Sequence, residues 1–307
     1  MMSTGRISTK KKREWTAAYL MSAPVVLGIF VFYLVPSIWT IFMSFTEGPN
    51  YTTYSFVGFK NFTILWEEFV NRKEFYYELV NTIYYAFVSV FLSLFFSVLF
   101  ANLLNQQIKA RSLFRLIYFL PCLTMASAVG VVWRNMLNSR FGLINILLGA
   151  VGIQGPKWLT DPNWAIPGVI LVGVWSSVGY NMILLLAGLQ NISKTYYEAA
   201  QIDGANVVQQ FIHVTVPLLS PVLFFVMLTA VMGGFKMFDL MYTLANAAAA
   251  APAILMNYRT MVYGIYQRGF LFTKFGVASA EAVILLAIIL ALTLVQMKAQ
   301  KKWVHYE

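Results

Sequence analysis

Residues Tyr196–Pro217 read YYEAAQIDGANVVQQFIHVTVP, a polar, helix-forming stretch that lies between two long apolar segments. Within it, Glu198 is followed by the small pair Ala199 and Ala200, and Gly204 comes four residues later. Small residues let another surface approach a helix backbone closely, and glycine ends a helix or permits a sharp turn. The stretch therefore predicts a short helix with a flat face, a break, and a second piece that leads into the next apolar segment.

A simpler interpretation covers part of this pattern. Thr195 and Glu198 have the spacing of a capping box, in which the threonine caps the helix and the glutamate side chain reaches back to the threonine amide. That arrangement would explain both residues without any partner molecule. It leaves Ala199, Ala200 and Gly204 unexplained, and Glu198 can serve both purposes.

The composition is that of a membrane protein with several spans. Apolar residues make up 59% of the 307-residue chain and charged residues only 11%, whereas a soluble domain carries about a quarter charged residues. We therefore expect an all-α membrane protein rather than two or three soluble domains. The single cysteine, Cys122, excludes an intrachain disulfide, and the two histidines, His213 and His305, are too far apart in sequence to suggest a metal site.

Six windows are apolar and long enough to cross a membrane as helices of about 20 residues. They are Ala17–Phe45, Leu79–Leu104, Leu113–Leu137, Trp164–Leu189, Leu218–Leu244 and Phe275–Met297. Pro24 and Pro36 are tolerable in the first, because neighbouring helices can satisfy the freed carbonyl groups. We expect Pro121 and Pro167 to kink or start their helices.

Basic residues flank the first and the last membrane span, which favours a membrane surface over nucleic acid as the partner, although the outer loops also hold several basic residues. The basic residues before the first span are Arg6, Lys10, Lys11, Lys12 and Arg13, and those after the last are Lys298, Lys301 and Lys302. Basic tails mark the cytoplasmic side, and an even number of spans puts both ends there. The expected organisation is a cytoplasmic tail 1–16, a six-span domain 17–297 with the polar loop 190–217 on the same side, and a cytoplasmic tail 298–307.

The polar loop resembles the cytoplasmic loop by which the membrane subunits of binding-protein-dependent ABC importers dock onto their ATPases. The family pattern is Glu-Ala-Ala, three residues, Gly, nine residues, then Ile-x-Leu-Pro. This chain has, at that spacing, Glu198, Ala199, Ala200, Gly204, Val214, Val216 and Pro217. The two valines differ from Ile and Leu in size but not in character. The resemblance implies that coupling to the ATPases rests on Glu198, Ala199, Ala200, Asp203, Gly204 and Pro217.

Further stretches resemble the carbohydrate-type permeases, the group that includes the maltose and glycerol-3-phosphate permease subunits. They are YLMSAPVVLGIFVFYLVPSIWTIFMSFTE in the first span, FVGFKNF (Phe56–Phe62), GYNMILLLAGLQNI, FKMFDLMYTL and FGVASAEAV. The resemblance implies a type I importer permease in the cytoplasmic (inner) membrane of a bacterium or archaeon. Its implied partners are a second homologous permease (a heterodimer), two ATPase subunits, an extracytoplasmic sugar-binding protein and membrane lipid.

The chain has no Gly-x-x-x-x-Gly-Lys-Ser/Thr phosphate loop. We therefore expect a transport subunit that is not itself an enzyme and holds no cofactor, with ATP and Mg²⁺ bound by the ATPase subunits. The five-alanine run Ala247–Ala251 stands where the family usually has a glycine-rich turn ending in proline. It either extends a helix by propensity or stands in for side chains that were not assigned.

Polar groups within spans are costly and mark a functional pathway by default. Sugars are held by hydroxyl and amide hydrogen bonds and by aromatic stacking, so the candidate pathway residues are Ser177, Tyr180, Asn181, Thr229, Gly233, Gly234, Lys236 and Asp239. Two structural interpretations compete with this. Small and hydroxyl residues also mediate helix packing in membranes, and Lys236 and Asp239, three residues apart, are expected to pair across one helical turn.

Glu281 lies about a turn inside the outer end of the last span, where it could extend outward, bind a neighbour or relay protons. An ion-coupled secondary transporter is the rival from another class, but it would need coupled carboxylates near the midplane, and only Asp239 and Glu281 are available. Another solute, such as a polyol phosphate, is the nearer alternative. A phosphate would favour several arginines in the cavity, whereas Lys236 is the one cationic candidate within a span.

Overall fold

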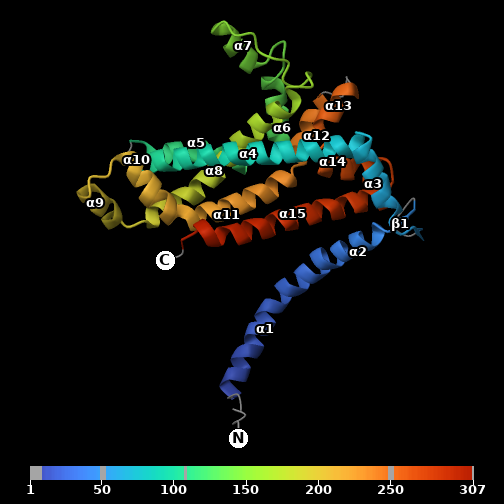
Figure 1. The fold of residues 1–307 in the computed structure, drawn as a ribbon, viewed down its shortest axis with the longest axis horizontal. Coiled ribbons are helices and arrows are strands. Elements are labelled where there is room, and N and C mark those ends of the chain that lie inside the picture. The colour runs from blue at the N-terminus through green and yellow to red at the C-terminus, as the bar shows by residue number, and fades with distance from the viewer. Residues whose placement is uncertain (1–8, 49–52, 107–108, 248–251, 306–307) are drawn as a thin grey trace.

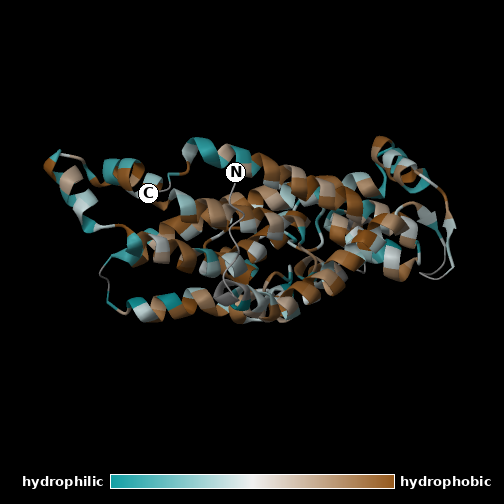
Figure 2. Cartoon of the chain, turned by 90° about the horizontal axis from the view of Figure 1, so that it is seen from below, coloured by the Kyte–Doolittle hydropathy of each residue, from teal (hydrophilic) through white to brown (hydrophobic). Residues whose placement is uncertain are grey.

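The computed structural model describes residues 9–48, 53–106, 109–247 and 252–305, and the chain forms a bundle of long helices (Figure 1). Five helical segments are long and apolar enough to cross a membrane: Arg13–Met43, Glu74–Asn105, Ala165–Asn191, Val207–Ala245 and Phe275–Trp303. These agree with five of the six predicted spans. Figure 2 shows polar residues gathered toward the two ends of the bundle and apolar residues between them.

The third predicted span, Leu113–Leu137, is not one continuous helix. It consists of α5 (Arg111–Leu123) and α6 (Ala126–Met136), which are bent by 102° relative to each other. Pro121 lies in the last turn of α5, and Thr124 and Met125 have extended backbone angles. The bend predicted near Pro121 is therefore present in this span, but it lies after the proline, at Thr124 and Met125, and α5 continues through Pro121 to Leu123.

The first span combines α1 (Thr9–Ile29), the π-helical turn η1 (Phe30–Leu34) and α2 (Val35–Met43). In η1 the amide of Val35 donates to the carbonyl of Phe30, one residue further back than in an α-helix. This wider turn makes room for the ring of Pro36, which clashes with a normal α-helical turn. The segment leads away from the bundle (Figure 1), and none of its most apolar window is buried.

The centre of the bundle is formed by α4 (Glu74–Asn105), α8 (Ala165–Asn191) and α11 (Val216–Phe235). Glycines on α8 allow close approach of its neighbours. A Cβ added at Gly179 would lie 1.8 Å from the carbonyl oxygen of Tyr118 on α5, and one at Gly173 would lie 2.3 Å from the hydroxyl of Tyr85 on α4. These contacts let α4 and α5 pack closely against α8.

One end of the bundle carries most of the short elements. They are the antiparallel strands β1 (Thr46–Glu47) and β2 (Ser55–Phe56), the helices α3 (Lys60–Val70), α12 (Asp239–Ala247), α13 (Pro252–Tyr258) and α14 (Met261–Tyr266), and the π-helical turn η3 (Gln267–Leu271). Helix α7 (Leu143–Ala150) projects from α6 beside the bundle (Figure 1). The other end carries α9 (Lys194–Ile202), α10 (Val207–Gln210) and the π-helical turn η2 (Phe211–Thr215). The last span, α15 (Phe275–Trp303), connects the two ends (Figure 1).

The fifth predicted span, Leu218–Leu244, also breaks. Helix α11 ends at Phe235 just after Gly233 and Gly234, which have weak helix propensity, and α12 begins at Asp239. In the alanine run, Ala247 is the last residue of α12. Residues 248–251 lie outside the described residues.

Candidate functional site

The polar loop contains a separately capped helix, α9, at one end of the bundle (Figure 1). The capping residue is Ser193, whose hydroxyl accepts a hydrogen bond from the amide of Thr195. The capping box expected at Thr195 and Glu198 is therefore wrong. A capping box forms instead at the start of α10, where Asn206 and Gln209 exchange side-chain and backbone hydrogen bonds at 2.8 and 2.9 Å.

Helix α9 ends as the glycine predicts. Gly204 has φ of +79°, the left-handed conformation that glycine adopts without strain. The amide of Ala205 donates to the carbonyl of Ala200 at 2.9 Å, and that of Gly204 donates to Gln201 at 3.0 Å. This pair of hydrogen bonds is a Schellman motif, with Asp203 as the last residue before the turn.

The outer face of the loop is uncovered. Glu198 and Ala199 are exposed and Ala200 is half-buried. Three apolar side chains on the same loop are exposed as well: Ile202 at 87%, Val207 at 79% and Val208 at 65%. Several exposed apolar side chains on one short loop are typical of a surface that another molecule covers, so this loop has the character of a contact surface.

The loop is joined to the fifth span by one hydrogen bond and one unusual turn. The hydroxyl groups of Tyr197 on α9 and Thr215 are 3.0 Å apart, and Thr215 is buried. In η2, the amide of Val216 donates to the carbonyl of Phe211, which widens the turn ahead of Pro217. Helix α9 and the start of the fifth span are therefore in direct contact.

A cavity of about 250 Å³ lies among α4, α8 and α11. Six of the eight predicted pathway residues line it: Ser177, Tyr180, Asn181, Thr229, Gly233 and Gly234. The hydroxyl groups of Ser177 and Thr229 donate to carbonyls of their own helices at 3.0–3.2 Å, which leaves their oxygen lone pairs able to accept from a ligand. The cavity thus offers hydroxyl, amide and aromatic groups, and their role in transport stays a prediction.

Helix α4 also contributes to this cavity, which was not predicted from the sequence. Tyr85, Ser89 and Ser93 line it from the second span. The signal was present, because Ser89, Ser93 and Ser97 recur every four residues in an otherwise apolar segment and so share one helix face. Ser97 donates across the helix interface to the carbonyl of Val178 at 3.2 Å, which shows that such serines also serve packing.

The other two predicted pathway residues do not line the cavity. Lys236 and Asp239 are both exposed and lie on either side of the break between α11 and α12. The expected pairing of these two residues is wrong, since the described part of the chain forms no ion pair between them. The reason is the break itself, which removes the helical turn that would have aligned them.

Glu281 belongs to a buried ionic cluster at the end of the bundle that carries strands β1 and β2. Nη1 of Arg268 donates to Glu281 and, at 2.6 Å, to Glu78, and Nη2 donates to Glu68 at 2.8 Å. The side chains of Glu281 and Glu78 are 0% and 1% exposed. The expectation that Glu281 binds a neighbour is confirmed, and the expectation that it extends outward is wrong.

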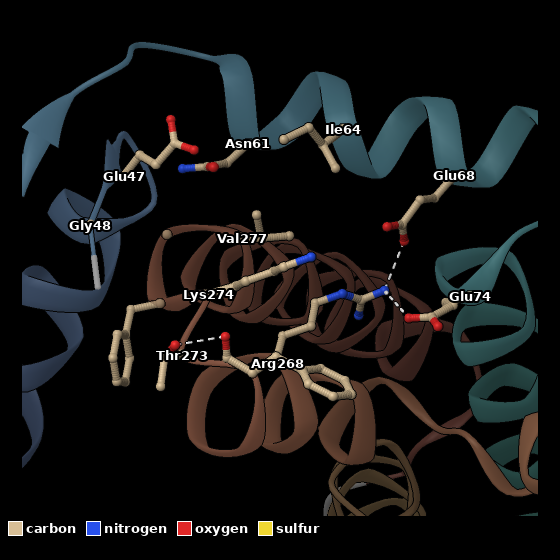
Figure 3. A pocket seen from close by; sticks show the side chains of 13 residues that line it. Glu47, Gly48, Asn61, Ile64, Glu68, Glu74, Arg268, Thr273, Lys274 and Val277 are labelled. Carbon is tan, nitrogen blue, oxygen red and sulfur yellow. Dashed lines mark hydrogen bonds and ion pairs between the residues drawn. The ribbon is translucent and has the colours of Figure 1, made fainter. Parts of the chain in front are cut away.

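The cluster borders a wider cavity of about 870 Å³ between α3 and the start of α15 (Figure 3). Glu68, Glu74 and Arg268 line it on one side, and Lys274 on another. Burial opposes the charge of Arg268, but Glu281, Glu78 and Glu68 outweigh this effect and raise the pKa of the guanidinium above its usual range. Arg268 is therefore a permanent cation that balances several carboxylates.

Comparisons with known proteins agree with this architecture. Residues 62–304 match the family described as "binding-protein-dependent transport system inner membrane component". The probable ABC transporter permease protein YesP of Bacillus subtilis (strain 168) is 34% identical, and the match covers 100% of this chain and 99% of that protein. The arabinooligosaccharides transport system permease protein AraP of the same organism is also 34% identical, over 92% of this chain and 88% of its own.

A solved structure shows the same fold. It is the crystal structure of a bacterial alginate ABC transporter in complex with an alginate pentasaccharide-bound periplasmic protein, which matches with a TM-score of 0.81 at 22% identity. The match covers 97% of this chain and 98% of that one. This chain therefore belongs to the family of binding-protein-dependent transport system inner membrane components, the family that its polar loop resembled.

Proposed function

We propose that this chain is a translocation subunit of an ATP-driven importer and that it moves a carbohydrate, an oligosaccharide or a sugar derivative, delivered by an extracytoplasmic binding protein. The family match supports the transport role. A relative whose name refers to arabinooligosaccharides and a neighbour crystallised with an alginate pentasaccharide support the substrate class. The chain itself catalyses no reaction in this proposal.

The observation that carries the proposal is the polar loop. It forms a capped helix with an uncovered face, and it joins α11 through the hydrogen bond between Tyr197 and Thr215. An ATPase that binds Glu198, Ala199 and Ala200 and closes on ATP would pull α9 with it. The spans would then rock between inward and outward access as rigid bodies.

The cavity among α4, α8 and α11 supports an uncharged, hydroxyl-rich substrate. Its lining, drawn entirely from described residues, holds no charged side chain. A polyol phosphate would need cationic partners for its phosphate, and Lys236, the cation predicted for this role, does not line the cavity. Sugar hydroxyls can instead be bound by Ser177, Asn181 and Thr229, with Tyr180 available for stacking.

The same proposal assigns the partners and the orientation. ATP and Mg²⁺ are bound by two ATPase subunits, and a second homologous permease completes a heterodimer. The amide of His305 donates to the hydroxyl of Ser220 at 3.0 Å, so the end of the chain lies beside the base of the polar loop. Both termini and the loop are then on the cytoplasmic side, as the basic tails predict.

An ion-coupled secondary transporter receives less support. Of the two carboxylates available to it, Glu281 is bound by Arg268 in the buried cluster. Asp239 is exposed at the start of α12. Neither lines the cavity among α4, α8 and α11.

The test uses the assembled complex, purified with its co-expressed ATPase in lipid nanodiscs. Binding-protein-stimulated ATP hydrolysis and substrate uptake are compared between the wild type and the Glu198→Ala and Gly204→Val variants. We expect both to fall in each variant: the first loses a contact, and the second forces a β-branched residue into a left-handed conformation. Space is not the cause at Gly204, because no atom lies within 4 Å of an added Cβ.

Gln201→Ala is the matched control, because Gln201 is exposed on α9 but lies outside the motif. It should leave hydrolysis and uptake unchanged. Transport without ATP by a chain that purifies alone would overturn the proposal and favour ion coupling.

A further inference from the structure

A third pocket, separate from the two cavities described above, lies where α4 and α8 end and α5 begins, next to the start of α9. Its volume is about 570 Å³. Three of its lining residues are cationic: Arg111, Arg115 and Lys194. All of its lining residues are described, and none of them is acidic. We refer to this site as the basic pocket.

The two arginines in the basic pocket are held close together. With the Gln190 amide oxygen turned toward them, that oxygen accepts from Nη2 of Arg111 at 2.8 Å and from Nη2 of Arg115 at 2.7 Å. Two guanidinium groups thus share one neutral acceptor, although like charges at short range repel. The Nε atom of each is also buried without a hydrogen-bond partner among the described residues. An anion bound in the pocket would supply the two guanidinium groups with a charged acceptor in place of one shared neutral oxygen.

The depth of the basic pocket in the membrane limits what that anion is. The pocket lies at the ends of three apolar helices, where the hydrocarbon core gives way to the lipid headgroups. Further along α5, Leu113, Leu116 and Ile117 are each 55–56% exposed. A ligand with an anionic head and apolar tails would contact the arginines and this surface together, whereas a free anion would use only the arginines.

We propose that the basic pocket binds the phosphate of an anionic phospholipid. Arginine pairs bind phosphate oxygens with planar, charge-assisted hydrogen bonds, and basic pockets between membrane helices suit anionic headgroups. Lys194 and Tyr197 are part of α9, so the bound headgroup contacts the base of the polar loop. This assignment rests on the membrane location and holds whatever solute is transported.

The test measures lipid retained on the intact complex. The complex is reconstituted in nanodiscs of phosphatidylcholine with phosphatidylglycerol, extracted into detergent, and analysed by native mass spectrometry. We expect the wild type to retain phosphatidylglycerol and the Arg111→Gln/Arg115→Gln variant to retain roughly a hundredfold less, given about a tenfold step for each of the two lost charge-assisted phosphate contacts.

The matched control is Lys298→Gln/Lys301→Gln, which removes two exposed charges at the same end of the bundle but outside the pocket. It should retain as much phosphatidylglycerol as the wild type. Arg111→Lys/Arg115→Lys keeps the charge but not the planar fork, so we expect partial retention. That variant decides the question if the glutamine variant does not fold, as judged by size-exclusion chromatography.

Three results would overturn the proposal. Equal retention in the wild type and both arginine variants would show that the pocket binds no lipid. Thermal stabilisation by inorganic phosphate that depends on the two arginines, without lipid retention, would assign the pocket to a free anion. Loss of the ATPase from the arginine variants in phosphatidylcholine alone would assign it to acidic groups of that partner.

Discussion

A single residue, Arg268, holds together parts of the chain that lie far apart in sequence. Its guanidinium contacts Glu68 and Glu78, which precede it by 200 and 190 residues, and Glu281, which follows it by 13. The Glu78 carboxylate also packs closely against the backbone of Gly264. A Cβ at Gly264 would lie 2.4 Å from a Glu78 carboxylate oxygen, so this position requires glycine. The cluster joins α3, α4, η3 and α15 at one end of the bundle.

Replacing Arg268 by methionine should lower the free energy of unfolding by about 3–5 kcal/mol, because it leaves buried carboxylates without their counter-charge. Thermal or denaturant unfolding of the purified protein in detergent measures this. The control is Lys60→Ala, which removes the ion pair with Glu47, whose side chains are 53% and 55% exposed. That change should cost less than about 1 kcal/mol, and similar losses in the two variants would show that the cluster does not stabilise the fold.

At the scale of elements, prolines shape the fifth span in two different ways. Ahead of Pro217 the chain widens into the π-helical turn η2. At Pro221, inside α11, the carbonyl of Pro217 that would have bonded the missing amide accepts instead from the hydroxyl of Ser220 at 2.6 Å. The first proline changes the path of the backbone, and the second leaves the helix regular.

Pro217→Ala should therefore let η2 return to an α-helical turn. The backbone hydrogen bond then reaches four residues back instead of five, and because each residue of an α-helix turns by about 100°, the loop rotates by roughly that angle relative to α11. This rotation breaks the hydrogen bond between Tyr197 and Thr215. Given about 1 kcal/mol for one hydrogen bond, we expect roughly a fivefold fall in binding-protein-stimulated ATP hydrolysis.

Pro221→Ala is the matched control, and it should leave this activity unchanged because no π-turn precedes it. The same activity in both variants would show that η2 does not transmit motion. Protein yield and the thermal midpoint are measured alongside, so that a folding defect is separated from a coupling defect.

At the scale of the whole molecule, the first span has little contact with its own chain. None of its most apolar window is buried, compared with 61% for the span Ala165–Asn191. Phe32 and Tyr33 on η1 are 76% and 73% exposed. Lipid can cover such a helix, but a second permease subunit would cover it specifically.

Cross-linking separates these possibilities and also locates the ATPase. In a Cys122→Ser background, Phe32→Cys should cross-link to the second permease and Ile202→Cys, on α9, to the ATPase. The cross-linked products are identified by mass spectrometry of the complex. Rapid labelling of Phe32→Cys by a lipid-soluble maleimide, with no cross-link, would mean that this helix faces lipid.

The sequence determined those features that depend on neighbours along the chain. Hydropathy located all six apolar segments but not the breaks within the third and the fifth, because an apolar run of sufficient length is stable in a bilayer only as a helix. The spacing from Glu198 to Gly204 predicted the short helix and its glycine ending, because the left-handed turn that ends a helix is a local property. The same spacing indicated the family.

Only the tertiary structure decided which distant residues meet. The sequence showed Glu281 in an apolar span but not its partner Arg268, and it showed the serines of α4 but not that they share a cavity with Asn181 and Thr229. The sequence likewise did not show the helix break between Lys236 and Asp239, so their three-residue spacing wrongly predicted that they would pair across one helical turn. A local sequence pattern shows which polar or charged groups are costly to bury. Which partner compensates for that cost depends on how helices that are remote in sequence pack together.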